Sequence, residues 1–281
     1  MEAFLITSAH IVAFERHLQD EERVRGTIEK YMRDLRAFAA YVGRESVSRE
    51  ALALWKERLI QNGYAPVTIN SMLAAVHAFL RFAGWPQFRV RYLRIQRKLF
   101  REPARSLSRA EYARLVEAAA ARGQARLALL MQTMGATGIR VSEVRYITVE
   151  AARSGRAQIS LKGKSRTILL PGKLCKRLLA YAQKNKIASG EVFLTRGGRS
   201  LNRRQIWHEM KTLCSRSDVA ATKVFPHNLR HLFATAFYGT SKDIVRLSDV
   251  LGHSSIETTR IYLISTGEEH TQMLERLNLV S

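Results

Sequence analysis

The sequence predicts a mainly α-helical protein of two domains, with a small β-hairpin in the second. Apolar residues recur every three or four positions in many segments, as in amphipathic helices, and one segment carries a hairpin pattern instead. The length of 281 residues suits two domains, and 46% hydrophobic residues provide a core for each. We expect a helical domain over residues 1–86, a linker over 87–105, and a mixed α/β domain with a C-terminal tail over 106–281.

Three amphipathic segments build the first domain. The segment "TIEKYMRDLRAFAAYV" predicts a helix over 27–42 behind a Thr27 cap, and "VTINSMLAAVHAFLRFA" predicts another over 67–83. Between them, "REALALWKERLIQNG" predicts a shorter helix that ends at Gly63.

The segment between the domains is basic and is interrupted by Pro86 and Pro103. Basic residues every two or three positions could lie along a phosphate backbone, or they could form an ordinary solvated loop. We favour the phosphate interpretation. The candidate DNA contacts in this linker are Arg89, Arg91, Arg94, Arg97, Lys98 and Arg101.

The second domain begins with a capping box, in which Ser108 and Glu111 each cap the backbone of the other. Further along, the β-prone runs "AQISL" and "TILL" flank "KGKSR", which predicts a hairpin with lysines at its tip. Helical patterns then resume. One of them, "RRQIWHEMKTLCSR", adds Arg203, Arg204 and Lys211 as candidate DNA contacts.

The charge of the chain points to a polyanionic partner. There are 46 Lys and Arg residues against 24 Asp and Glu, which gives a net charge of +22 and a pI near 10.7, so nucleic acid is the leading partner. No apolar run is long enough to span a bilayer and the N-terminus lacks a basic leader, so we expect a soluble cytoplasmic protein. The two cysteines are far apart and lack clustered histidines, and no phosphate-binding loop motif occurs, so neither a metal nor a nucleotide cofactor is expected.

Several short motifs carry groups that bind phosphate or move protons. "FPHNLRH" places His227 and Arg230 on one face at the start of a helix, whereas His231 points elsewhere and is expected to pack away from them. "GATGIRVSEV" places Arg140 after a glycine with Glu143 three residues on. "VLGHSS" supplies His253, and Tyr262 follows it nine residues later. Each motif alone is also compatible with a basic DNA-binding patch or a structural role.

Together, and in this order, the motifs "TGIRVSE", a hairpin lysine, "HNLRH", "LGHSS" and a downstream tyrosine resemble the signature of the tyrosine recombinases, the integrase and Xer-like site-specific DNA recombinases. The resemblance covers residues 106–281, and the first domain is similar to the helical, SAM-like core-binding domain of that family. It implies a tyrosine recombinase catalytic domain that acts without a cofactor.

The resemblance also implies a role for each site residue. Tyr262 would attack a phosphodiester and become joined to the 3′ phosphate, and Lys162 would protonate the departing 5′ oxygen, with Lys164 as the alternative. Arginine can donate two parallel hydrogen bonds to phosphate, which suits Arg140 and Arg230 for binding the charged transition state. His227 and His253 would add donors or exchange a proton, and Glu143 would support the site.

The expected partners are double-stranded DNA core sites and further copies of the chain. The tail residues Met273, Leu274, Leu277 and Leu279 lie on an amphipathic segment that would dock on a neighbouring subunit, giving four protomers on two DNA sites, or else pack on its own domain. The chain begins almost at once with the core-binding domain, so we expect no arm-binding domain; accessory DNA-bending proteins stay open. The resulting activity would be integration, excision, inversion or resolution, as in mobile genetic elements. A non-catalytic DNA-binding regulator and a type IB topoisomerase are the alternatives.

Overall fold

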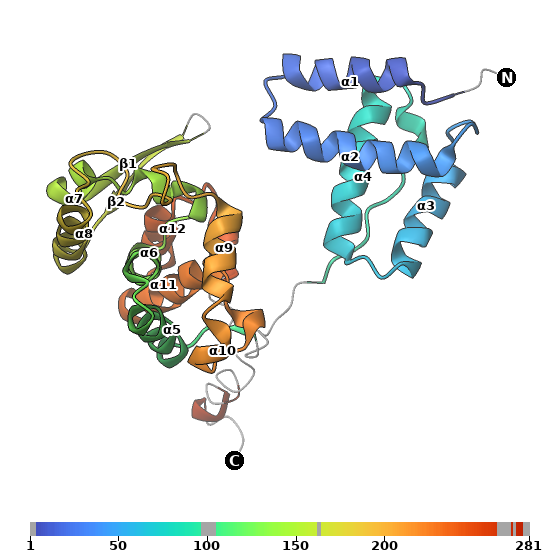
Figure 1. The fold of residues 1–281 in the computed structure, drawn as a ribbon. Helices are drawn as coiled ribbons and strands as arrows, with labels where there is room; N and C mark the ends of the chain where they lie inside the picture. The colour runs from blue at the N-terminus through green and yellow to red at the C-terminus, as the bar shows by residue number, and fades with distance from the viewer. Residues whose placement is uncertain (1–3, 97–104, 162–163, 263–270, 272–273, 278–281) are drawn as a thin grey trace. The chain divides into compact units, whose positions relative to one another are not determined.

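The chain divides into two compact units in the computed structural model, Met1–Arg97 and Lys98–Ser281, here called unit 1 and unit 2 (Figure 1). The structure describes residues 4–96, 105–161, 164–262, 271 and 274–277. Within these residues, no helix has the length and apolar character needed to cross a membrane.

Unit 1 is helical, as predicted. Its elements are α1 (Ser8–Asp20), α2 (Arg25–Val42), α3 (Arg49–Gln61), α4 (Pro66–Phe82) and the 3-10 turn η1 (Pro86–Phe88). Helix α2 packs against both α1 and α4, and Leu35 and Phe38 of α2 and Phe79 of α4 are fully buried in the core of the unit. The three predicted helices are confirmed, but α2 begins two residues before Thr27, and α1 was not predicted.

The segment after α4 folds back onto unit 1. Phe88, Val90 and Leu93 pack against its core, and the Asn70 side chain holds the backbone of Leu93 through two hydrogen bonds, of 2.9 and 2.8 Å. The first part of the predicted linker is therefore packed on the helices. Its basic side chains Arg89, Arg91 and Arg94 are exposed there, whereas Arg97, Lys98 and Arg101 lie outside the described residues.

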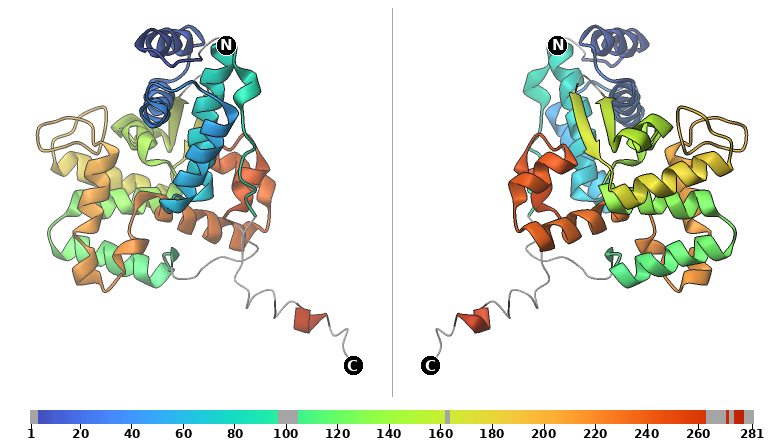
Figure 2. Two further views of the ribbon diagram at one scale, coloured as in Figure 1. Left: turned by 90° about the vertical axis from the view of Figure 1, so that its right-hand side faces the viewer. Right: turned by 90° about the vertical axis from the view of Figure 1, so that its left-hand side faces the viewer.

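Unit 2 contains most of the helices and the hairpin. Its helices are α5 (Arg109–Ala121), α6 (Ala125–Thr137), α7 (Val149–Ser154), α8 (Gly172–Lys184), α9 (Arg203–Lys211), α10 (Cys214–Ser217), α11 (Pro226–Ser241), α12 (Ile244–Leu251) and α13 (Ile256–Arg260), with 3-10 turns η3 (Val141–Tyr146) and η4 (Ala221–Lys223). Helix α6 packs between α5 and α11, and α7 packs against both α8 and β1, so hairpin and helices share one core (Figure 2). The predicted capping box of Ser108 and Glu111 is confirmed at the start of α5. The segment predicted as one helix from Arg203 is divided into α9 and α10.

The hairpin extends further than its sequence pattern indicated. Strand β1 (Arg156–Leu161) pairs antiparallel with β2 (Lys164–Leu169), and Leu161 faces Lys164 across a two-residue connection. The expected "KGKSR" turn is thus wrong in extent, because cross-strand pairing draws Lys164, Ser165 and Arg166 into β2. Lys162 falls in the connection, outside the described residues.

Candidate active site

Arg230 lies at the centre of the site, although it is a charged side chain with only 2% of its surface exposed. Pro226 starts α11 with a backbone angle suited to the first helical turn, and Arg230 follows one turn later. One terminal nitrogen of the guanidinium donates to the carbonyl of Gly138 at 2.6 Å, and the other donates to the carbonyl of Leu251 at 2.8 Å. These bonds fix the arginine between the ends of α6 and α12.

Gly138 is required at the end of α6. It adopts a left-handed conformation with φ of +64°, and a Cβ there would lie 2.3 Å from the Phe233 ring. Glycine alone therefore allows this close approach of the backbone to α11 and directs a carbonyl at Arg230.

Tyr262 is buried, with 3% of its surface exposed, just after α13. Its hydroxyl accepts a hydrogen bond from Nε of Arg230 at 3.4 Å. Its ring stacks on His253 with centroids 5.8 Å apart, and the rings of His227 and His231 lie 5.9 and 5.0 Å away. The predicted nucleophile therefore sits among the predicted phosphate-binding and proton-transfer groups of its own chain.

The protonation of His253 follows from its partners. Arg230 can only donate, so Nε2 of His253, 2.8 Å from the guanidinium, must accept. Its Nδ1 then carries the proton and donates to the hydroxyl of the buried Thr259 at 2.9 Å. Desolvation, with the positive charges of Arg230 and Arg140, lowers the pKa of His253 to about 4, which keeps the ring neutral at physiological pH.

His227 points outward from the first turn of α11 and is exposed. Partial desolvation, followed by the charges of Arg230, Arg203 and Arg140, lowers its pKa below the ordinary value. Helix α9 packs against both α11 and η3, and Arg203 and Arg204 are exposed in its first turn. Lys211 is different, because its ammonium lies over the Trp207 ring and donates to the carbonyl of Ala221 within the unit.

Arg140 and Glu143 form an ion pair at 3.0 Å, and Glu143 also accepts from the backbone N–H of Arg140 at 2.6 Å. Glu143 is 2% exposed and has a second arginine partner, Arg166 of β2, at 2.5 Å. Arg140 further donates to the carbonyl of Gly252 at 3.2 Å. Arg140 is 40% exposed, so a ligand can reach it from solvent.

Of the two candidate lysines, the backbone places Lys164 as the first residue of β2. Neither lysine has a described side chain, so Lys162 and Lys164 stay open as predictions.

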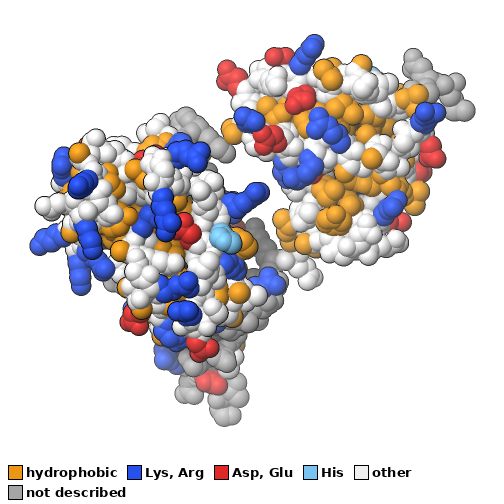
Figure 3. All heavy atoms as spheres, in the orientation of Figure 1, with side chains coloured by type: hydrophobic (Ala, Val, Ile, Leu, Met, Phe, Trp, Pro, Cys, Tyr) orange, Lys and Arg blue, Asp and Glu red, His pale blue; other side chains and the backbone are white. Residues whose placement is uncertain are grey.

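Basic side chains are frequent on the surface of unit 2. Figure 3 shows Lys and Arg side chains over the visible face of unit 2, with a histidine among them and fewer acidic side chains. Within the described residues, no group of three or more His, Cys, Asp or Glu side chains is arranged to hold a metal ion.

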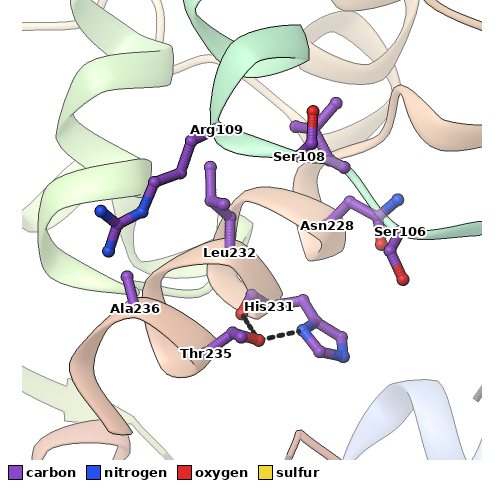
Figure 4. A pocket seen from close by; sticks show the side chains of 9 residues that line it. Ser106, Ser108, Arg109, Asn228, His231, Leu232, Thr235 and Ala236 are labelled. Carbon is purple, nitrogen blue, oxygen red and sulfur yellow. Dashed lines mark hydrogen bonds between the residues drawn. The ribbon is translucent and has the colours of Figure 1, made fainter. Parts of the chain in front are cut away.

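His231 was expected to pack away from the site, but its ring contacts Tyr262 edge to face. It also lines a hollow of about 250 Å³, where it bonds Thr235 (Figure 4). In the same hollow, Asn228 donates to the carbonyls of Arg105 and Lys223 at 2.9 and 2.7 Å. These bonds attach Arg105 and the end of η4 to α11.

Three residues of this constellation were missed from the sequence: Arg166, His231 and Thr259. Arg166 was assigned to a turn, because the sequence did not reveal that it pairs with Ile159 across the two strands. Thr259 has no motif of its own, since only the folding of α13 against the Gly252 turn brings it to His253.

A family model described as "Phage integrase family" matches residues 105–269, and a second, "Phage integrase, N-terminal SAM-like domain", matches residues 11–87. The chain belongs to the phage integrase family. As a member of it, the protein is a tyrosine recombinase, and the predicted resemblance is confirmed. A tyrosine recombinase XerA of Pyrococcus furiosus is 28% identical over 276 residues, covering 95% of this chain and 93% of the relative. A tyrosine recombinase XerD of Caulobacter vibrioides is 28% identical over 277 residues, covering 89% and 90%.

Solved structures share the fold of this recombinase. A lambda integrase(75-356) dimer bound to a COC' core site matches with a TM-score of 0.74 and 15% identity, covering 91% of this chain and 94% of that one. The XerH site-specific recombinase bound to difH substrate matches with a TM-score of 0.67 and 19% identity, covering 95% and 84%. The predicted fold class is confirmed: the protein is mainly helical with a small sheet, and a SAM-like domain precedes the catalytic domain.

Proposed function

We propose that this recombinase cuts and rejoins double-stranded DNA at specific core sites, through a 3′-phosphotyrosine intermediate and a Holliday junction. The observation that carries the proposal is the contact between the Tyr262 hydroxyl and Arg230, inside a ring of three histidines. DNA as substrate is further supported by the +22 charge and by relatives named as DNA-bound recombinases.

In the proposed reaction, the Tyr262 oxygen forms a bond to phosphorus as the bond from phosphorus to the 5′ oxygen breaks. The tyrosine proton passes to a histidine, and a hairpin lysine, Lys162 or Lys164, gives a proton to the 5′ oxygen. The free 5′ hydroxyl of a partner strand reverses these steps. The energy of the original bond is kept in the phosphotyrosine, so no external energy source is consumed.

The two arginines have complementary roles in this proposal. Arg140 is 40% exposed and would meet the scissile phosphate first, whereas Arg230 is buried beside the nucleophile. Their guanidinium donors would stabilise the extra negative charge of the transition state. When phosphate competes for Arg230, Nε2 of His253 loses its donor and becomes free to accept the tyrosine proton.

The proposal extends to assembly and DNA contact. Leu274 and Leu277 in the tail are 66% and 57% exposed, which supports docking on a neighbouring subunit and four protomers on two DNA sites. Arg203 and Arg204, with the exposed linker residues Arg89, Arg91 and Arg94, are proposed to contact the DNA backbone.

The test is covalent capture. A DNA carrying the repeats that flank the gene, nicked beside the candidate scissile phosphate, would be incubated with the wild-type chain and with Tyr262→Phe, and the products separated on a denaturing gel. We expect a 3′-linked adduct with the wild type, and DNA binding without an adduct in the variant. An adduct in Tyr262→Phe would remove the nucleophile assignment. Specific binding without an adduct by the wild type would favour a regulator, and supercoil relaxation without recombinant product would favour a topoisomerase.

A further inference from the structure

Arg166 occupies a position that the proposed chemistry leaves unused. It lies in β2 opposite Ile159, and its side chain is 15% exposed. One terminal nitrogen donates to Oε2 of Glu143 at 2.5 Å, and the other donates to the carbonyl of Val250, in α12, at 3.1 Å. A single guanidinium therefore joins the hairpin to both η3 and α12.

Glu143 links Arg166 to Arg140. The oxygen that accepts from Arg166 also accepts from the backbone N–H of Arg140, and the second oxygen binds the Arg140 guanidinium. Of the two arginines on this carboxylate, Arg140 is 40% exposed and Arg166 only 15% exposed. Arg140 is therefore accessible to a ligand, whereas Arg166 links the surrounding elements to one another.

The turn that carries His253 rests directly on Arg166. Gly252 has a φ of +62°, and a Cβ there would lie 2.4 Å from Cδ of Arg166. The carbonyl of the same glycine accepts from Arg140. The hairpin, Arg140 and the His253 turn therefore meet at one side chain.

Arg166 also adds charge without touching the reacting atoms. Arg140, Arg166 and Arg230 with Glu143 leave an excess of positive charge. Desolvation is the main cause of the lowered pKa values of Arg230 and His253, and the cation of Arg166 makes a smaller contribution to both. Such a fixed charge in a partly desolvated site favours a transition state that gains negative charge.

We propose that Arg166 is a positioning residue for strand cleavage: it holds the hairpin, and with it the hairpin lysine, in register with Arg140 and the His253 turn. The inference rests on the proposed function. A lysine at position 166 keeps the charge, but its single ammonium cannot replace the fork that reaches Glu143 and Val250 together.

The experiment separates proton delivery from the rest of catalysis. Single-turnover cleavage would be measured on nicked DNA with an ordinary scissile phosphate and on the same DNA with sulfur in place of the bridging 5′ oxygen. A thiol has a pKa of about 8.5, so a sulfur leaving group does not need the proton that a lysine gives to oxygen. The full-length variants are Arg166→Lys, Arg166→Gln and, as a control that removes a cation from the far end of the hairpin, Arg156→Gln.

We expect Arg166→Lys to cleave the oxygen substrate about 100-fold more slowly than wild type, as for a displaced catalytic group. It should cleave the sulfur substrate at close to the wild-type rate. Arg166→Gln should be only partly rescued by sulfur, because the charge is also lost, and Arg156→Gln should match the wild type on both.

A second pair of variants leaves Arg166 in place. Gly252→Ala and Gly155→Ala both put alanine at a positive φ, of +62° and +72°, but only at position 252 would the new Cβ meet Arg166. We expect a sulfur-rescued loss of cleavage in Gly252→Ala and none in Gly155→Ala, which keeps the proposal testable if Arg166→Lys fails to fold.

Two results would overturn the inference: wild-type cleavage by Arg166→Lys and Gly252→Ala, or a loss in them that is equal on the oxygen and sulfur substrates. Absence of any adduct with the wild-type chain on either substrate is a different result. It would remove the proposed function, and this inference with it.

Discussion

Two histidines, one in each unit, have similarly lowered pKa values but different hydrogen-bond partners. Desolvation, followed by nearby arginines, lowers the pKa of both His77 and His253 to about 4. In unit 1, Nε2 of His77 accepts from the backbone N–H of Val90 at 3.4 Å and helps to hold the segment after α4. In unit 2, His253 connects Arg230, Thr259 and the ring of Tyr262.

The comparison shows that a strongly lowered pKa reports burial and positive charge, not function. What distinguishes His253 is its geometry, since it contacts the proposed nucleophile Tyr262 and the buried guanidinium of Arg230. The buried polar groups of the two units differ in the same way. Among the described residues, those of unit 1 are Asp34 and His77, whereas unit 2 buries Glu143, Asn228, Arg230, Thr259 and further Ser and Thr side chains. Unit 1 is thus held by apolar packing, and unit 2 keeps a costly polar network around its site.

The largest expected effect is on the stability of unit 1. Phe79 is fully buried there, and Phe79→Ala should reduce the free energy of unfolding by about 3–5 kcal/mol. The units have separate cores, so unit 2 should unfold as before. Urea titration followed by the indole NMR signals would separate them, because Trp55 and Trp85 lie in unit 1 and Trp207 in unit 2. Phe79→Leu is the milder control, and an equal loss at all three tryptophans would contradict this division.

A smaller effect, in rate instead of stability, is expected for Arg230→Lys. Lysine keeps the charge but cannot reach Gly138, Leu251 and Tyr262 together, so adduct formation should fall about 100-fold while DNA binding persists. Single-turnover capture on nicked DNA measures this. Arg177→Lys, on the exposed side of α8, should cleave normally, and normal cleavage by Arg230→Lys would exclude Arg230 from transition-state binding.

The smallest expected effect is on how the stability of each unit depends on pH. A histidine with a folded pKa of about 4 and an unfolded pKa of about 6.5 takes up its proton more readily when unfolded. Both units should therefore lose stability as the pH falls from about 6.5 to 4. His253→Gln should flatten this dependence for unit 2 alone, and His77→Gln for unit 1 alone. Urea titrations across that range, read from the same indole signals, test both, and unchanged slopes would show that other groups dominate.

The site was predictable from the sequence to the extent that its groups stand in short motifs. Arg140 with Glu143, His227 with Arg230, and His253 are marked by local spacing and by adjacent glycine or proline. Tyr262 was identified by its interval from His253 and by the family resemblance. Arg166 was not predicted as part of the site because its segment was interpreted as a turn. His231 was not predicted because it was expected to pack away from the site.

The sequence by itself determined the helical character of both units, the capping box at Ser108 and the types of side chain that the site contains, because periodicity, caps and residue type act over a few positions. Only the tertiary structure decided which partners those groups meet. Arg230 is held by carbonyls 92 residues before it and 21 residues after it, and Arg166 reaches Glu143 across 23 residues. Such contacts depend on strand register and on how helices pack, and no local pattern encodes them.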